Sequence, residues 1–190
     1  RTSPGARLSP FPVRVILRRC AAVRANQMPK RRKKKIVRVV HQSAGPLPLR
    51  LADRFSGCRL IFSDASRKRH GGLAVVLFGD PESSPLVATR SVALAGSNEL
   101  ELAAALFGLE EAQRQFPGEP AALFSDNQDA VTRLGRAKAE GLDQDPALAR
   151  MLAERGLASV PDCVSVCWVQ GHAACRGNAL ADQHARAAAG

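Results

Sequence analysis

Hydrophobic and polar positions first form a regular pattern at Cys58, and from there the chain predicts a series of strands. Residues 59–63 and 72–78 are compact apolar runs, and residues 86–94 alternate between two sets of side chains, as strands do. The turn-forming residues of 79–84 separate the second run from the third. Because short loops join antiparallel neighbours, these three strands predict a meander.

Helical spacing replaces the strand pattern after the third run. Apolar residues recur on one helix face from Leu102 to Leu109. Ser97 or Asn98 can cap this helix, and Pro117-Gly118 ends it. A strand, two helices, a strand and a helix follow, at residues 121–125, 128–138, 146–157, 164–169 and 178–189. The order βββαβααβα predicts an α/β fold, in which helices flank a five-stranded mixed sheet whose first three strands are antiparallel.

Residues 1–57 differ from the rest of the chain in composition. They are rich in Pro, Arg and Lys and show little periodicity, so we interpret them as a mostly disordered arm and linker, with one β-prone stretch at 36–40. The arm holds 15 Lys and Arg against one acid, a net charge of +14, whereas residues 58–190 hold 13 against 16, a net charge of −3. We therefore divide the chain into a basic arm and a folded domain, 58–190.

The positive charge of the arm is densest in the unbroken cationic run of residues 30–35. Such runs bind nucleic-acid phosphates with little sequence preference and strong salt dependence, and Lys33 and Lys34 are our candidates for this contact. The run is also typical of a nuclear-localisation signal or a solvated tail, and residues 1–27 have features of an organelle transit peptide. Met28, just before the run, is a candidate initiator.

The cysteines and the apolar runs favour a cytoplasmic protein, with the nucleus or an organelle as the alternative. Five cysteines occur at no recognised disulfide spacing, so we expect reduced thiols. Cys163, Cys167, His172 and Cys175 carry zinc-binding groups, but their spacing is not that of a standard zinc finger. No apolar run approaches the roughly 18–20 residues of a membrane span, and we expect no membrane partner.

Acidic residues stand where predicted strands end. Asp64 ends the first strand and Asp126 follows the fourth, while Glu101 lies in the first turn of the first helix and Asp182 in the last helix. Charges beside core strands are costly unless they are paired or bound to metal. A carboxylate cluster is the ligand set that Mg²⁺ or Mn²⁺ prefers. Two such ions can stabilise both the attacking and the leaving oxygen in phosphodiester hydrolysis.

Four motifs contain these acids. They are Phe-Ser-Asp64-Ala-Ser, Ser-Asn98-Glu-Leu-Glu101-Leu-Ala-Ala, Phe-Ser-Asp126-Asn-Gln128, and Trp168-Val-Gln-Gly171-His172-Ala with Gly177-Asn178-Ala-Leu-Ala-Asp182. With these motifs in this order, residues 58–190 resemble type 1 ribonuclease H, including the domains attached to reverse transcriptases, and that family's fold has the same order of elements. The resemblance implies an endoribonuclease that cleaves the RNA strand of RNA–DNA hybrids with two Mg²⁺ ions, or Mn²⁺, leaving 5′-phosphate and 3′-hydroxyl ends.

The resemblance also implies a role for each matching residue. Asp64 would bridge both ions, and Glu101 and Asp126 would hold the ion that positions the attacking water. Asp182 would hold the ion on the leaving-group side. His172, in the loop before the last helix, would assist proton transfer or product release. The residues expected to contact the hybrid are Ser66, Asn98, Gln128 and Asn178.

Some of these positions also have plainer interpretations. Asn98 can serve as a helix cap, Gln128 can be an ordinary surface residue, and Trp168 is expected to pack in the core at the end of the fifth strand. Ala179 stands where the family usually has an acid, which is not a metal ligand, so we expect a small effect. The stretch between Asp126 and His172 is short and only weakly basic, so we expect no basic protrusion like that of some bacterial members, and the basic arm is expected to compensate.

We therefore expect an enzyme that acts on RNA–DNA hybrids as a monomer, without an obligate protein partner. One alternative is a fragment of a reverse transcriptase or mobile-element polyprotein, which the coding sequence upstream of Arg1 would reveal. The other is a non-catalytic module that only binds nucleic acid. The presence of all four acids favours the enzyme over that module.

Overall fold

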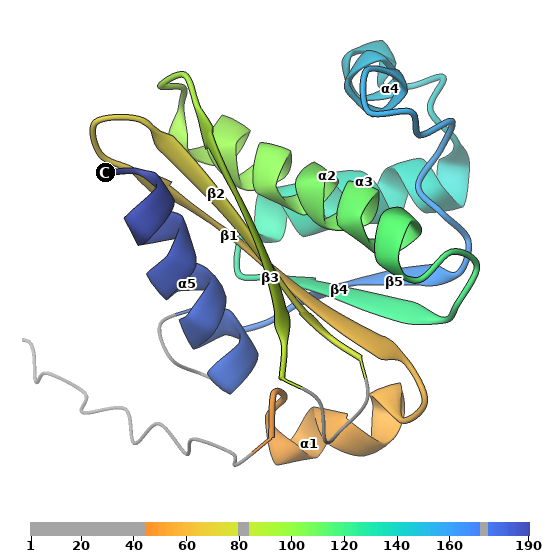
Figure 1. The fold of residues 1–190 in the computed structure, drawn as a ribbon. Coiled ribbons are helices and arrows are strands. Elements are labelled where there is room, and N and C mark those ends of the chain that lie inside the picture. Colours follow the sequence, from red (N-terminus) through yellow and green to blue (C-terminus); the bar gives the residue numbers. More distant parts are fainter. Residues whose placement is uncertain (1–44, 80–83, 172–174) are drawn as a thin grey trace, which may run out of the picture. The chain divides into compact units, whose positions relative to one another are not determined.

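A computed structural model of the chain describes residues 45–79, 84–171 and 175–190 (Figure 1). All of them belong to one compact unit, Arg38–Gly190. Its elements are α1 Leu49–Ala52, a 3-10 turn Asp53–Phe55, β1 Arg59–Arg67, β2 Gly71–Phe78, β3 Leu86–Val92, α2 Ser97–Gln115, β4 Ala121–Ser125, α3 Gln128–Glu140, α4 Pro146–Ala153, β5 Val164–Trp168 and α5 Arg176–Ala188. The β-prone stretch at 36–40 lies outside the described residues.

A five-stranded sheet in the order β3-β2-β1-β4-β5 forms the centre of this unit. β1, β2 and β3 make the predicted antiparallel meander, and β4 and β5 run parallel to β1. Parallel neighbours cannot be joined by a tight turn, so the chain passes through α2 before β4 and through α3 and α4 before β5. The mixed sheet with its flanking helices confirms the predicted fold class.

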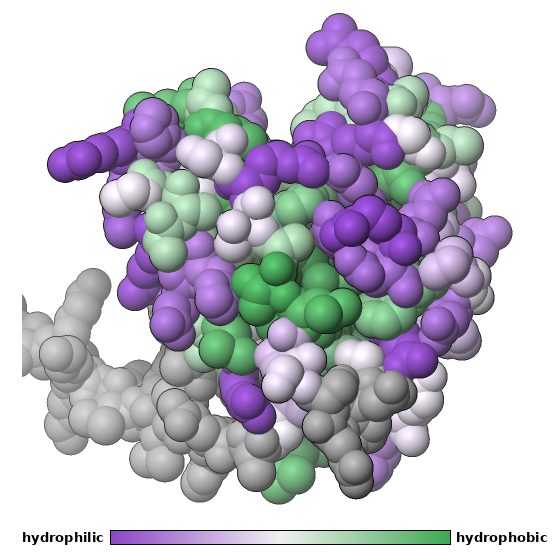
Figure 2. Space-filling view, viewed as in Figure 1, coloured by the Kyte–Doolittle hydropathy of each residue, from purple (hydrophilic) through white to green (hydrophobic). Residues whose placement is uncertain are grey.

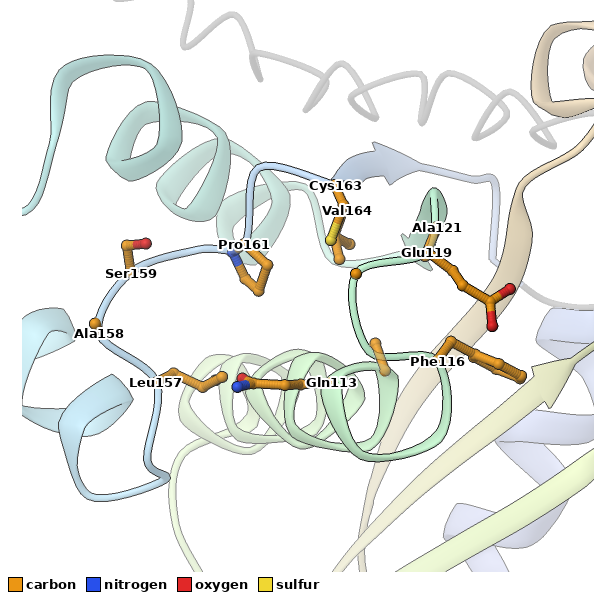
Figure 3. Close-up of a pocket in the computed structure, with 12 residues that line it drawn as sticks. Gln113, Phe116, Glu119, Ala121, Leu157, Ala158, Ser159, Pro161, Cys163 and Val164 are labelled. Atoms are coloured by element: carbon orange, nitrogen blue, oxygen red, sulfur yellow. The ribbon is translucent and has the colours of Figure 1, made fainter.

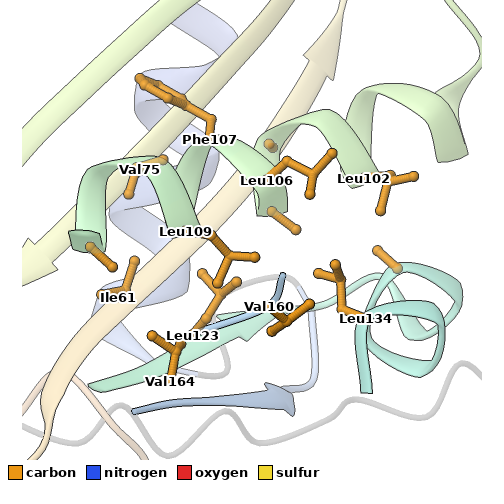
Figure 4. Close-up of a cluster of buried hydrophobic side chains, with 14 of the residues drawn as sticks. Ile61, Val75, Leu102, Leu106, Phe107, Leu109, Leu123, Leu134, Val160 and Val164 are labelled. Carbon is orange, nitrogen blue, oxygen red and sulfur yellow. The ribbon is translucent and has the colours of Figure 1, made fainter. Parts of the chain in front are cut away.

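The first of two apolar cores lies between the sheet and the helices α2, α3 and α4 (Figure 4). Leu106 and Leu109 of α2, which recur at helical spacing, pack with Ile61 of β1 and Val75 of β2. Leu134 brings α3 into the same cluster. Each strand supplies alternate residues to this face, because successive side chains of a strand point to opposite sides of the sheet.

The second core lies on the opposite face, under α5 and the segment that precedes β1. Phe62 of β1 and Phe124 of β4 stack with their ring centroids 5.0 Å apart. Phe55 meets the Phe124 ring edge-on, also at 5.0 Å, and Leu47 joins the same cluster. Aromatic pairs in these geometries add to the stability that comes from burial alone.

Helix α5 lies so close to the sheet that two positions in the contact require glycine. A Cβ atom on Gly177 would lie 2.3 Å from the Phe62 ring, and one on Gly72 would lie 2.2 Å from the carbonyl oxygen of Ala185. Asp182 lies between these two contacts along α5. The glycines therefore set the distance of Asp182 from the sheet.

The folded region begins earlier than the sequence pattern predicts. We assigned residues 1–57 to the mostly disordered arm and linker, but Leu47 and Phe55 are buried, and the Pro46 carbonyl accepts a hydrogen bond of 3.1 Å from the Gly177 N–H. The segment contains a four-residue helix and a three-residue turn, which are too short to show a helical period. The apolar residues of this segment are isolated in the sequence, so no periodic pattern indicated that they are buried. The division into arm and domain otherwise stays a prediction.

Three local details also differ from the predictions. β1 continues through Arg67, so Asp64 lies within the strand and not at its end. Gly96 occupies the cap position before α2, where Ser97 or Asn98 was expected, and its N–H donates to Glu99 Oε2 at 2.9 Å. Because α2 begins at Ser97, Glu101 lies in its second turn and not in its first.

The edge strand β3 carries exposed apolar side chains. Leu86 and Val87 are 49% and 42% exposed, and apolar side chains gather over β3 near the middle of the face shown in Figure 2. Within the described ranges, no helix is both long enough and apolar enough to cross a membrane.

Replacing Phe55 tests whether the segment before β1 belongs to the fold. Phe55→Ala removes the ring that packs on Phe124, so the free energy of unfolding should fall by about 3 kcal/mol, as for other buried aromatic residues. Chemical denaturation measures this change. Leu49→Ala, at a position in the same segment that is 80% exposed, is the control and should change stability by less than about 0.5 kcal/mol. Equal effects of the two substitutions would contradict the assignment.

Candidate metal centre and active site

Three acidic side chains from distant parts of the sequence meet beside the sheet. Asp64 lies in β1, Glu101 in α2 and Asp126 directly after β4. Each offers one carboxylate oxygen, and these oxygens all lie within 4.8 Å of one another. The structure thus brings together three of the four acids that the sequence motifs indicate as metal ligands.

The register of the sheet places the two aspartates at matching positions. Phe62 pairs with Phe124 across the parallel strands β1 and β4, and each aspartate follows its phenylalanine by two residues. In sheets of this kind, ligands bind beyond the carboxyl ends of parallel strands. Asp126 lies at that end of β4, and α2, which packs over β1, brings Glu101 to it.

Burial and mutual repulsion make the ionised forms of these acids unfavourable. The pKa of Asp64 is raised to about 7, first by burial and then by the charges of Asp126 and Asp182. The pKa of Glu101 is raised to about 8 by burial and then by the charges of Asp64 and Asp126. Carboxylates this close repel one another, so either one of them holds a proton or a cation binds among them.

This set of oxygens fits a divalent metal ion. Glu101 Oε2 is buried and has no hydrogen-bond partner among the described residues. A buried polar atom without a partner is costly, and native proteins rarely leave one unexplained. A hard cation such as Mg²⁺ or Mn²⁺ would satisfy this oxygen and offset the repulsion at the same time.

Asp182 lies near the three acids but outside their cluster. Its charge contributes to the raised pKa values of both Asp64 and Glu101, so the carboxylate is close by. Its Oδ2 nevertheless forms an ion pair with Arg186 Nη2 at 2.8 Å, one turn further along α5. The four predicted ligands are therefore arranged as three together and one apart.

The segment that follows β5 holds Asp126 in position. The Trp168 indole N–H donates to the carbonyl oxygen of Asp126 at 2.9 Å, and the Val169 N–H donates to that of Ser125 at 3.0 Å. A Cβ atom on Gly171 would lie 2.4 Å from Asp126 Oδ2. The carboxylate therefore lies directly against the backbone of Gly171, where a larger side chain would displace it.

Trp168 corrects a prediction, because it does not pack in the core. It is 47% exposed on β5, which is an edge strand of the sheet. Strand alternation predicts which face a residue occupies, but it does not tell whether another element covers that face. The indole instead contacts a residue of the acidic cluster, a role that the sequence pattern did not indicate.

Asn98 is exposed and takes part in a hydrogen-bond network that joins α2 to α3. Its Nδ2 donates to Asp129 Oδ2 at 3.0 Å, and its Oδ1 accepts from Asn127 Nδ2 at 3.2 Å. Asn127 in turn caps α3, since its Oδ1 accepts from the Ala130 N–H at 2.8 Å. We did not predict a role for Asn127, although an Asn directly before a helix is a capping signal. The network fixes the orientation of the Asn98 amide.

The other predicted contact residues differ in their accessibility. Gln128 is exposed at the start of α3, and the half-buried Ser66 lies two residues after Asp64 on the same side of β1. Asn178 is only 1% exposed because the first turn of α5 packs against the sheet, so it is not available for the predicted contact. His172, Lys33 and Lys34 lie outside the described residues.

A cavity of about 290 Å³ lies away from the acids (Figure 3). Its lining includes Phe116, Leu157, Pro161 and Cys163, together with Ala121 and Val164, the first residues of β4 and β5. The acidic cluster adjoins the opposite end of β4. We therefore do not assign this cavity to the chemistry of the acids. Among the described cysteines, Cys58, Cys163, Cys167 and Cys175 are free thiols.

Comparison with known proteins decides the family. The sequence model described as RNase H matches residues 58–190. The chain belongs to the ribonuclease H family. Membership supports a nuclease of the ribonuclease H type, and in general terms cleavage of the RNA strand of RNA–DNA hybrids with divalent metal ions. A search of curated protein sequences found no match.

Solved structures of a viral ribonuclease H domain share the fold. The solution structure of the RNase H domain of Prototype Foamy Virus is 17% identical with a TM-score of 0.51, over 69% of this chain and 93% of that one. The protease–reverse transcriptase of the same virus is 18% identical with a TM-score of 0.50, over 69% of this chain but 20% of the longer one. RNase H1 of Halobacterium salinarum is 23% identical with a TM-score of 0.48, over 70% and 97% of the two chains.

Adding one methyl group at Gly171 should displace Asp126. Gly171→Ala places a Cβ atom against Asp126 Oδ2, so affinity for Mn²⁺ should fall by about tenfold, as when other groups that orient metal ligands are changed. Trp168 is the one tryptophan of the chain and lies beside Asp126, so quenching of its fluorescence by Mn²⁺ measures the affinity. Gly135→Ala, in open space on α3, is the control and should bind Mn²⁺ normally. Equal affinities in both variants would show that Gly171 does not position the carboxylate.

Without divalent ions, the free energy of unfolding should fall as pH rises from 5 to 8. The folded protein holds protons on Asp64 and Glu101 up to pH values of about 7 and about 8, whereas the unfolded chain releases them near pH 4. The stability that these protons provide is therefore complete below pH 4 and is lost as pH rises through the raised pKa values. Denaturation in EDTA at several pH values measures this effect.

Asp64→Asn should reduce this pH dependence, since it removes one titrating group and relieves the repulsion on Glu101. Asp143→Asn replaces an exposed acid between α3 and α4 and should leave the pH dependence unchanged. The same slope in the wild type and in Asp64→Asn would contradict the raised pKa values.

Proposed function

We propose that this chain is a metal-dependent endoribonuclease that hydrolyses the RNA strand of RNA–DNA hybrids and leaves 5′-phosphate and 3′-hydroxyl ends. The observation that carries the proposal is the meeting of Asp64, Glu101 and Asp126 within 4.8 Å in a member of the ribonuclease H family. Apolar packing does not favour three carboxyl groups in close contact. A bound cation would stabilise this arrangement.

Asp64, Glu101 and Asp126 would hold one Mg²⁺ or Mn²⁺ ion, and Asp182 would join Asp64 in holding a second. When bound, such ions stabilise charge on the attacking and leaving oxygens of the phosphodiester. The position of Asp64 supports its place between two ions, because both Asp126 and Asp182 act on its pKa. Asp64 and Glu101 would release their protons as a metal ion binds, which makes metal affinity rise with pH.

Asn98 is the best-supported residue for recognition of the RNA strand. It is exposed, lies three residues before Glu101, and is fixed in orientation by Asn127 and Asp129. An amide nitrogen carries two hydrogens and Asp129 accepts one of them, so the second can be donated to a sugar hydroxyl. The 2′-hydroxyl is the group that distinguishes RNA from DNA. Gln128, next to Asn127 in the sequence, would contact the hybrid beside it.

Other parts of the proposal rest on the sequence alone. His172 would assist proton transfer or product release, as its place in the family motif implies. Lys33 and Lys34 would add salt-dependent affinity for phosphates. A monomeric state, a cytoplasmic location and the alternative origin in a reverse transcriptase or mobile element stay predictions.

A labelled RNA–DNA hybrid tests the activity directly. Cleavage should occur with Mg²⁺ or Mn²⁺ and stop in EDTA. Asp64→Asn should lower the rate by about a hundredfold or more, since removing one charge-stabilising group from an active site often costs this much. Asp143→Asn, which removes an equal charge at an exposed position away from the cluster, should cleave at the wild-type rate.

Duplex RNA, duplex DNA and single strands serve as substrate controls and should remain intact. Cleavage in EDTA, or wild-type cleavage by Asp64→Asn, would refute the proposed metal centre. Hybrid binding without cleavage in either metal would instead favour the non-catalytic module. The chemistry of the product ends is read by ligation and by phosphatase treatment.

A further inference from the structure

Asp182 and Arg186 pair on the outer part of α5, at 2.8 Å between Asp182 Oδ2 and Arg186 Nη2. Asp182 is the only acidic residue of α5, and it is the one predicted metal ligand outside the three-carboxylate cluster. Both side chains are open to solvent, with 31% and 56% of their surfaces exposed. A cationic side chain therefore occupies the carboxylate that a second metal ion would need.

We propose that Arg186 is a positioning residue that keeps Asp182 out of the metal centre until a second divalent ion binds. This inference rests on the proposed function. The first ion needs only Asp64, Glu101 and Asp126, which already lie together. The second ion gains Asp182 only when Arg186 releases it. The two ions therefore bind in separate steps, the first strongly and the second weakly.

The location of Arg186 separates this pair from an ordinary ion pair on a helix. Its Nη2 lies 2.8 Å from Oδ2 of Asp182, the acid that a second ion would need as a ligand. Without Arg186, Asp182 would be free to approach the three acidic groups of the cluster. Exposed pairs at this spacing are weak, and a weak pair is what allows a second ion to replace the arginine.

Counting bound Mn²⁺ by electron paramagnetic resonance, without nucleic acid, tests the proposal. The wild type should bind Mn²⁺ in two steps. Arg186→Gln should lower the Kd of the second step by about twofold to fivefold, the range for removal of one exposed competing ion pair, and should change the first step less. Arg186→Lys keeps the charge, so its Kd for the second step should lie between those of the wild type and of Arg186→Gln.

Arg176→Gln is the matched control for loss of positive charge. Arg176 is exposed at the start of the same helix, six residues before Asp182. This variant should bind Mn²⁺ as the wild type does. In an Asp182→Asn background, Arg186→Gln should not raise the Mn²⁺ affinity of the second step, since the carboxylate that the arginine holds is gone.

Two results would overturn the inference. One is an equal Kd of the second Mn²⁺ step in Arg186→Gln and Arg176→Gln. The other is an Arg186→Gln effect on that Kd that is the same with and without the Asp182 carboxylate. Failure of the proposed metal centre gives a different result, because the wild type would then lack even the first step. Circular dichroism of each variant confirms that the fold is retained.

Discussion

Repulsion among carboxylates is the constraint on which the rest of this structure depends. Asp64, Glu101 and Asp126 bring their oxygens within 4.8 Å of one another in a partly buried place, where the effective dielectric is lower than in water and repulsion is stronger. Protons can relieve it, as the raised pKa values of Asp64 and Glu101 show. A divalent cation relieves it better, because two positive charges are shared among several oxygens.

The apolar cores supply the stability that keeps these acids together. The stacked rings of Phe62 and Phe124 join β1 to β4 two residues before the aspartates. On the other face of the sheet, α2 packs along β1 and brings Glu101 with it. A cluster held by local loops could relax by moving apart. Asp64 lies in a strand, Glu101 lies in a helix and Asp126 directly follows a strand, and the sheet that carries these elements is packed on both faces, so separating the acids would disrupt both cores.

Sequence patterns predicted most of the fold because its elements are long enough to show a period. The three-strand meander and the apolar face of α2 are examples, and the four motifs indicated the acids. The burial of Leu47 and Phe55 could not be predicted, since it depends on a surface that exists only after α5 has packed on the sheet. Trp168 was misplaced for a related reason: no periodic pattern shows that β5 lies at an edge. The arrangement of three acids together and Asp182 apart depends on a side-chain pairing, which spacing along the chain does not encode.

In the proposed metal centre, Asp126 would be a fixed ligand and Asp182 an adjustable one. Asp126 is fixed by backbone contacts, through the Trp168 indole and the close approach of Gly171. Asp182 has a firm backbone, because glycines seat α5 on the sheet, but its side chain is held by an exposed ion pair. Firm ligands lower the cost of ordering the site when a first ion binds. In the proposed enzyme, an adjustable fourth ligand would let the charge of the centre change when a second ion and a phosphodiester bind. The ordering cost would then lie in the folded scaffold, and the Asp182 carboxylate could exchange its ion pair for a metal ion.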